Sequence, residues 1–366
     1  MKGYIALLIG LFLSSCANGQ VKKAENGIDH STVEITDKQS KLIFKNARQF
    51  PNNTELSIAF IHQGKTKFVG VKRMNDTIKI RKNHQSVFEI GSISKVFTSS
   101  LLSSFVLNKE LSLEDAIQDH LELTLKPDDK ITFKELANHT SGLPRLPSNL
   151  DLLAVDPNNP YKEYDAEKLI EYLNEEVELQ QKPGTEYGYS NLGAGLLGYG
   201  LAKMSNSSYE DLLQERIFEK YGMSNSTTQP NKIKNQIIHG LNPNGEVTSK
   251  WDFNVLAGAG AILSTTEDLS KFALAQFDTE NKELILTQEP TFKVDKNMQV
   301  GLGWHILPDE SGDELIWHNG GTGGYTSSIA LDTENKKGII ILSNVSAFNS
   351  KMGNIDELCF ELIETL

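Results

Sequence analysis

Two periods of hydrophobicity alternate along this chain and predict where its strands and helices lie. Residues 56–62 and 66–71 are short apolar stretches separated by a glycine turn, which is typical of paired strands. Residues 38–49 before them can form a helix. Between residues 92 and 107 the apolar positions recur three and four apart, which predicts a helix that starts directly after an apolar stretch.

The middle of the chain is mostly helical, and its end returns to strands. Residues 165–179 and 208–220 are amphipathic over several turns, as expected for helices with one buried face. The later elements predicted from the pattern are a strand-like stretch and a helix within 256–276, strands over 301–307, 314–317, 325–331 and 338–342, and a helix over 354–366.

Strands near both ends, with helices between them, indicate one sheet domain interrupted by a helical domain. We assign residues 37–109 and 251–366 to the sheet domain and residues 110–250 to the helical domain. The chain has 366 residues, which is enough for a sizeable core.

Residues 1–15 are predicted to be a processing signal and not part of the fold. Lys2 supplies a positive start, and the apolar run after it is too short to span a bilayer. Small residues precede Cys16, which resembles the lipobox of bacterial lipoproteins, where the cysteine is lipidated and the chain is cut before it. An ordinary secretory signal with an incidental cysteine is the alternative. Residues 16–36 are polar and are interpreted as a tether to the membrane.

Composition narrows the possible partners. The formal net charge is -12, so the chain has no general affinity for nucleic acid or for an anionic membrane surface. Of the two cysteines, Cys359 alone would remain free once Cys16 is lipidated, so no intramolecular disulfide is expected.

Ser92-Ile93-Ser94-Lys95 is the only S-x-x-K sequence in the chain. Positions three apart on a helix share a face, so the Ser92 hydroxyl and the Lys95 amine can meet. A serine becomes a nucleophile when a base takes its proton, and a buried lysine can lose its charge and act as that base. A capped helix with a solvent-exposed lysine is the alternative, and it is the better interpretation of this motif taken alone.

A second candidate group lies in a loop rich in proline and glycine. Tyr189 and Asn191 form a Y-x-N there, where a rigid loop can direct a phenol toward a cleft and an amide toward a substrate. A second Y-x-N at residues 172–174 lies within a predicted helix and is interpreted as core and surface.

The third group is His318-Asn319-Gly320-Gly321, which follows an apolar strand. Its glycines would let a substrate lie close to the backbone. Taken alone, the same residues would also fit a flexible hairpin with a surface histidine.

Together these motifs resemble the class C β-lactamases and the related serine DD-peptidases. The resemblance runs from about Thr54 to Asn344. It rests on residues 89–95, 138–144, 183–191, 263–269 and 318–320, in that order. It implies an α+β fold: an antiparallel sheet flanked by helices, with an inserted and mostly helical domain.

The resemblance also implies roles for single residues. Ser92 is similar to the family nucleophile, Lys95 and Tyr189 to its general-base pair, and the backbone N–H groups of Ser92 and Gly321 to its oxyanion hole. Catalysis would proceed through a covalent acyl-enzyme.

On the substrate side, Asn191 is similar to the residue that binds the acyl amide, and His318 and Gly320 belong to the substrate-binding strand. His318 stands where the class C β-lactamases have a lysine. A histidine is mostly neutral at pH 7, so it would attract a substrate carboxylate less strongly. Efficient β-lactamase action is therefore less expected than acyl transfer itself.

Other chemistries are not supported by the sequence. Residues 193–198 match G-x-G-x-x-G, but the stretch before them is polar and loop-like, so packing of small residues on a helix explains the glycines better than a dinucleotide site. G-x-S-x-G and H-E-x-x-H are absent from the chain. We expect no metal and no cofactor, and we interpret His139 as a packing residue rather than a base.

Three functions follow from these observations. The first is an amide hydrolase of the bacterial cell envelope that acts on β-lactams or on D-Ala-D-Ala ends of peptidoglycan. The second is a carboxylesterase or D-amino-acid peptidase on the same scaffold. The third is a non-catalytic envelope protein that binds wall peptides. The expected partners are a small-molecule or peptide substrate and a membrane reached through the lipid anchor, on the periplasmic or the outer face.

Overall fold

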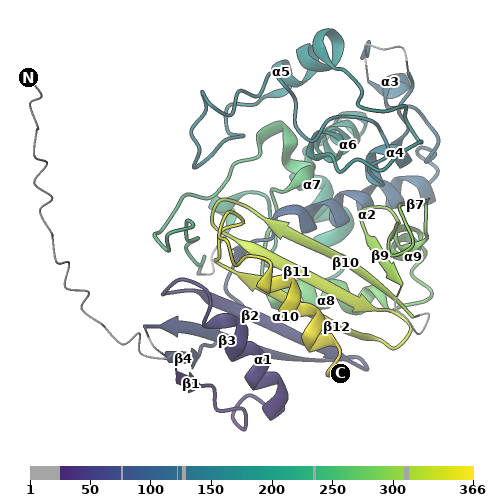
Figure 1. Ribbon diagram of the computed structural model, residues 1–366. Helices are drawn as coiled ribbons and strands as arrows, with labels where there is room; N and C mark the ends of the chain where they lie inside the picture. The colour runs from purple at the N-terminus through teal and green to yellow at the C-terminus, as the bar shows by residue number, and fades with distance from the viewer. Residues whose placement is uncertain (1–24, 76, 122, 126–128, 234–235, 309–312) are drawn as a thin grey trace, which may run out of the picture.

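The computed structural model describes residues 25–75, 77–121, 123–125, 129–233, 236–308 and 313–366. Its largest element is a ten-stranded sheet with the order β1-β4-β3-β2-β12-β11-β10-β9-β8-β7 (Figure 1). The strands of this sheet are β1 Glu25–Gly27, β2 Glu55–His62, β3 Lys65–Met74, β4 Thr77–Ile80, β7 Phe292–Lys293, β8 Gln299–Val300, β9 His305–Pro308, β10 Glu314–Gly321, β11 Thr326–Asp332 and β12 Lys337–Ser343. A separate two-stranded sheet joins β5 Phe88–Glu89 to β6 Leu263–Ser264.

The α+β fold expected from the sequence is confirmed. Neighbouring strands pair antiparallel, except that β1 pairs with β4 in parallel at the sheet edge. The hydrophobic pattern did not predict this parallel pairing of the first strand, β1, with β4.

The central strands are buried on both faces, because helices cover the sheet on both sides. Along β12, Ile339 and Ile341 pack into a core with α1 and α10, while Ile340 and Leu342 pack into the core that contains α2 and α8. This alternation is the two-residue period of a strand, here apolar on both sides. The α-helices are α1 Asp37–Ala47, α2 Ser94–Leu107, α3 Ile117–His120, α4 Phe133–Ala137, α5 Ala166–Glu171, α6 Asn191–Met204, α7 Tyr209–Leu213, α8 Thr266–Gln276, α9 Lys282–Gln288 and α10 Asn354–Ile363.

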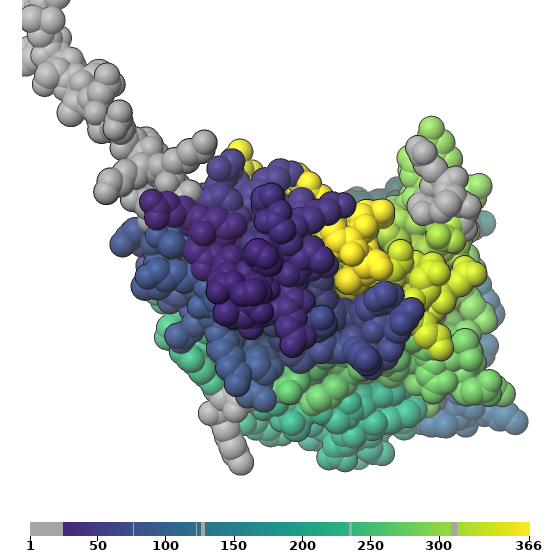
Figure 2. Space-filling model, turned by 90° about the horizontal axis from the view of Figure 1, so that it is seen from below, coloured from purple at the N-terminus to yellow at the C-terminus, as the bar shows by residue number. Residues whose placement is uncertain are grey.

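The first and last segments of the described chain lie side by side on one face (Figure 2). Lys45 of α1 donates hydrogen bonds to Glu357 and Glu361 of α10, at 2.8 and 2.7 Å. Ile28 and Ile35 are buried in the core beneath this face. The tether predicted over residues 16–36 is therefore too long, since its part from Glu25 onward belongs to the folded sheet domain. The signal, Cys16 and the start of the tether lie outside the described residues.

The two long helices expected in the middle of the chain are shorter and irregular. The first consists of α5 followed by a π-helical turn, η2 Tyr172–Glu176, and it ends where Val177 takes an extended conformation. The second consists of α7 followed by another π-helical turn, η3 Gln214–Phe218. Among the described residues, every helix is too short or too polar to span a bilayer.

Helix α2 lies between the sheet and the helices of residues 110–250 (Figure 1). Almost its whole length is buried, so its apolar side chains and its small hydroxyl side chains are both packed against neighbouring elements. The hydroxyls of Thr98, Ser100, Ser103 and Ser104 donate to backbone carbonyls, as Ser100 does to Val96 at 2.9 Å. The element before it is a 3₁₀ turn, η1 Gly91–Ile93, so Ser92 stands at the start of a buried helix.

Candidate active site

Ser92 lies in a tight turn whose backbone is in close contact with the backbone of β10. Gly91 before it has a φ of 52°, in the left-handed region that favours glycine. A Cβ on Gly91 would lie 2.5 Å from the Gly321 nitrogen, and one on Gly320 would lie 2.0 Å from the Ile90 oxygen. The glycines of both motifs therefore let β10 lie directly against the turn that presents Ser92.

Lys95 is buried beneath Ser92. Its Nζ lies 3.0 Å from Ser92 Oγ and donates to the Ala259 carbonyl at 2.7 Å. Within the described chain it has no acidic partner. Burial, and to a lesser degree the charge of Arg145, hold the pKa of Lys95 well below its usual value. A neutral amine has a free lone pair, so this lysine can accept the Ser92 proton.

Tyr189 completes the group around the nucleophile. Its hydroxyl is hydrogen-bonded to Ser92, and its ring centroid lies 4.9 Å from Lys95 Nζ. Burial raises the pKa of Tyr189 to about 12, and the Ser92 hydrogen bond and Arg145 offset this only in part. Burial thus lowers the pKa of the amine and raises that of the phenol, which favours Lys95 as the proton acceptor and Tyr189 as a proton donor.

The histidine of β10 is not on the surface. The motif lies within the strand and not after it, and His318 is 1% exposed, so the flexible-hairpin interpretation is wrong. His318 Nδ1 lies 2.6 Å from the Asn319 oxygen, and its Nε2 has no hydrogen-bond partner among the described residues. Burial and the neighbouring His305 and Lys95 hold its pKa well below 6.5, so the ring is neutral.

His139 packs against the phenol ring of Tyr189, a partner that the sequence did not predict. Its ring centroid lies 4.4 Å from that of Tyr189, and its Nδ1 accepts a hydrogen bond from the Ser190 N–H at 3.2 Å. Burial lowers its pKa well below 6.5. These contacts fix the loop that carries Tyr189.

Asn191 is the first residue of α6, directly after Ser190, whose hydroxyl caps the helix by accepting from the Gly193 N–H at 2.8 Å. Its Oδ1 has no partner within the described chain. Asn191, Ser92 and Gly321 line one pocket of about 410 Å³. The structure thus brings residues from η1, α6 and β10 to a single cavity of the size that small ligands occupy.

The family profile described as Beta-lactamase matches residues 44–358. The chain belongs to the beta-lactamase family. A Beta-lactamase of Escherichia coli (strain K12) is 26% identical over 382 residues, which cover 91% of this chain and 92% of that protein. Protein flp of Staphylococcus aureus (strain MW2) is 25% identical over 283 residues, which cover 74% of this chain and 55% of flp. The chain therefore spans about half the length of that relative.

Two solved structures share the fold of this chain. A Beta-Lactamase/D-Alanine Carboxypeptidase from Pseudomonas syringae superposes with a TM-score of 0.74 at 22% identity, covering 89% of this chain and 98% of its own. An octameric penicillin-binding protein homologue from Pyrococcus abyssi superposes with a TM-score of 0.74 at 23% identity, covering 92% of this chain and 77% of its own. The resemblance found in the motifs and the fold expected from it are confirmed.

Two residues near Ser92 had no role in the sequence analysis. Glu89 belongs to the first motif, and its buried carboxylate accepts hydrogen bonds from the Thr322 hydroxyl and, at 2.8 Å, from the Trp251 N–H. Arg145 follows the 138–144 motif, and its Cζ lies 5.0 Å from the Tyr189 ring centroid. An acid within the apolar stretch 87–90 was a signal for Glu89, whereas nothing in the local pattern separates Arg145 from a surface arginine.

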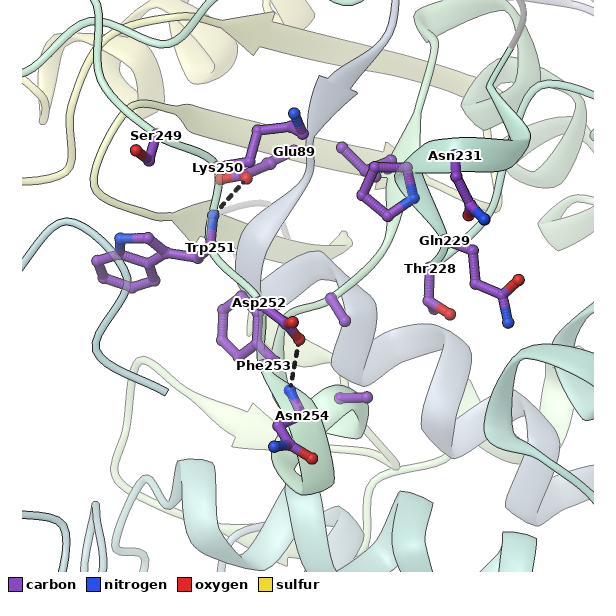
Figure 3. Close-up of a pocket in the computed structure, with 15 residues that line it drawn as sticks. Glu89, Thr228, Gln229, Asn231, Ser249, Lys250, Trp251, Asp252, Phe253 and Asn254 are labelled. Carbon is purple, nitrogen blue, oxygen red and sulfur yellow. Dashed lines mark hydrogen bonds between the residues drawn. The ribbon is translucent and has the colours of Figure 1, made fainter. Parts of the chain in front are cut away.

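A second and larger cavity, of about 650 Å³, lies next to the pocket of Ser92 (Figure 3). Trp251 and Phe253 line both cavities. In Figure 3, Gln229 and Asn231 stand across the cavity from Trp251, and the Glu89 carboxylate lies beside the Trp251 backbone N–H, from which it accepts a hydrogen bond. Glu89 therefore ties this wall to Thr322, the residue that follows Gly321 of β10.

The glycines of residues 193–198 serve packing, as the sequence analysis proposed. A Cβ on Gly195 would lie 2.6 Å from Leu256 Cδ2, and one on Gly198 would lie 2.9 Å from the Gly258 Cα. Among the described residues, no group of three or more histidine, cysteine, aspartate or glutamate side chains is placed to hold a metal ion.

Proposed function

We propose that this protein is a serine acyl hydrolase in which Ser92 is the nucleophile and Lys95 its base. The observation that carries the proposal is the distance of 3.0 Å between the Ser92 hydroxyl and a buried amine without an acidic partner in the described chain. A base at this distance is within reach of the proton that it must abstract.

In the proposed reaction, Ser92 Oγ attacks the substrate carbonyl carbon while its proton passes to Lys95 Nζ. The backbone N–H groups of Ser92 and Gly321 stabilise the oxyanion that forms. The Tyr189 phenol donates a proton to the leaving group as the carbonyl bond to it breaks, and Lys95 restores that proton. Water then attacks the acyl-enzyme, and Ser92 leaves with a proton returned through the same pair.

The substrates that we propose are amides, either β-lactams or peptides that end in D-Ala-D-Ala. The names of the E. coli and P. syringae relatives support this class. The unpartnered Oδ1 of Asn191 supports it too, since a substrate amide N–H would satisfy that oxygen.

A second candidate is a carboxylesterase or D-amino-acid peptidase. The observation that favours it is the buried and neutral His318 in β10, where the class C β-lactamases have a lysine. A neutral ring offers less attraction to a substrate carboxylate on that side of the nucleophile.

The experiment compares three substrates: a chromogenic cephalosporin, a peptide ending in D-Ala-D-Ala and a short p-nitrophenyl ester. We expect opening of the lactam or release of D-alanine, and we expect Ser92→Ala to abolish it. Ester hydrolysis without either reaction would favour the second candidate. No turnover of any of the three would contradict the proposal and favour a wall-binding protein.

We also propose that a lipid on Cys16 holds the protein in the bacterial cell envelope. The lipobox-like residues before Cys16 support this. Cell fractionation tests it, because Cys16→Ser should move the protein out of the membrane fraction, and an unchanged distribution would contradict the anchor.

A further inference from the structure

The pocket beside Ser92 has mainly apolar and aromatic walls, with Tyr161, Trp251 and Phe253 among them. Leu152 and Phe348 line it as well, and they are 52% and 65% exposed, so the apolar surface continues to the outside. Among its described lining residues, Arg145 is the only one with a charged side chain.

The backbone holds Arg145 in place at the start of α6. Its carbonyl accepts hydrogen bonds from the N–H groups of Asn191 and Leu192, at 3.0 and 3.2 Å. Its guanidinium lies over the ring of Tyr189, with Cζ 5.0 Å from the centroid. This cation therefore faces the same pocket as the nucleophile, on the side where Asn191 stands.

Arg145 differs from a structural arginine of the same chain. Arg216 donates to both carboxylate oxygens of Glu110, at 2.9 and 3.1 Å, and its guanidinium lies over the ring of Phe105. Arg145 forms no ion pair within the part of the chain that the structure describes, although acids outnumber lysines and arginines by 48 to 36. An exposed guanidinium without an acidic partner is free to form paired hydrogen bonds with a carboxylate.

The β10 histidine does not supply a second charge to this pocket. His318 is neutral and is not among the residues that line it. Positive charge at the pocket surface thus comes from Arg145.

We propose that Arg145 binds a carboxylate on the acyl part of the substrate, while the aromatic walls hold the apolar chain or ring that carries it. This inference rests on the proposed function and adds the substrate class: acyl donors with an anionic group on the side of Asn191. Arg145 is thereby a specificity-determining residue.

Two matched esters test the proposal: the mono-p-nitrophenyl ester of adipic acid, and p-nitrophenyl hexanoate, which has a methyl group in place of the carboxylate. The measured quantity is the ratio of kcat/KM for the anionic ester to kcat/KM for the neutral one. Because both esters react at the same centre, this ratio cancels any general damage to the site. We expect Arg145→Gln to lower the ratio by about 10- to 100-fold, the range for a charge-assisted hydrogen bond.

Two further variants sharpen the result. Arg145→Lys keeps the charge but loses the planar fork, so its ratio should lie between those of the wild type and Arg145→Gln. Lys250→Gln removes a cation from the neighbouring cavity and should leave the ratio within about twofold of the wild type, because it does not line this pocket.

An Arg145→Gln ratio equal to that of the wild type, with both esters still hydrolysed, would overturn the inference and leave the proposed function standing. A failure of both esters to acylate Ser92 of the wild type would overturn the inference, and the proposed function would fall with it only if the cephalosporin and the D-Ala-D-Ala peptide were not turned over either.

Discussion

The pocket of Ser92 and the larger cavity beside it share Trp251 and Phe253 as a wall, yet their chemistry differs. The smaller pocket holds a hydroxyl 3.0 Å from a buried lysine. The larger one is lined by polar side chains such as Gln229 and Asn231. Its buried acid, Glu89, accepts two hydrogen bonds within the protein. Volume alone would therefore point to the wrong cavity, whereas a desolvated base beside a nucleophile identifies the reactive one.

The largest expected effect concerns the base. Lys95→Ala should lower the acylation rate by about 10² to 10⁴, the usual contribution of a positioned base. Stopped-flow measurement of acyl-enzyme formation checks it. Acylation at the wild-type rate would show that the smaller pocket is not reactive in the proposed way.

The pH profile of the wild type sharpens this result. Activity requires neutral Lys95, so kcat/KM should rise with pH through the pKa of this group. Because burial lowers that pKa, the rise should be complete well below pH 10.5. A rise centred near 10.5 would mean that Lys95 is solvated and charged.

Tyr189→Phe should have a smaller effect. It removes the phenol that donates to the leaving group but leaves the ring beneath Arg145 in place, so kcat should fall by about 10- to 100-fold. Since the pKa of Tyr189 is about 12, the phenol should stay protonated below pH 10, and the wild-type rate should not fall in that range through its ionisation. A rate unchanged in Tyr189→Phe would remove the phenol from the mechanism.

The smallest expected effect concerns Glu89, which lines the larger cavity and bonds to the shared residue Trp251. Burial raises the pKa of Glu89 from 4.5 to about 7, so its contribution to stability is full below pH 4.5 and is lost as pH rises through 7. Glu89→Gln has no such ionisation. The free energy of unfolding of the wild type should therefore fall relative to this variant by about 1–3 kcal/mol between pH 4.5 and 8.

Urea unfolding at several pH values measures this difference. Asn231→Ala, in the same cavity but exposed, is the control and should keep the pH dependence of the wild type. Parallel curves for the wild type and Glu89→Gln would contradict a buried ionisable group at the wall.

Most of the sheet domain was predictable because its pattern is local. Strands β2, β3, β11 and β12 and helices α1, α8 and α10 lie where the apolar periods put them, within a few residues. The irregular helices were not predictable, since the π-helical turns at 172–176 and 214–218 keep a helical spacing of apolar residues. The edge strand β1 was missed because its three residues are polar and exposed.

In the candidate site, too, contacts between residues close in sequence were predictable, and contacts made by tertiary packing were not. Ser92 and Lys95 are three apart within one predicted helix, so the sequence alone predicts that they meet. Tyr189 and Gly321 could be placed beside them only through the resemblance to a family, because tertiary packing brings them together. Arg145 lines the pocket because its loop packs on the start of α6, and no pattern in the sequence predicts this packing.

Intact-protein mass spectrometry after exposure to a penicillin and to a p-nitrophenyl ester tests the central claim most directly. The wild type should gain the mass of one acyl group, peptide mapping should locate it on Ser92, and Ser92→Ala should gain none. An adduct that persists in Ser92→Ala, or one that maps to another residue of the wild type, would contradict the account.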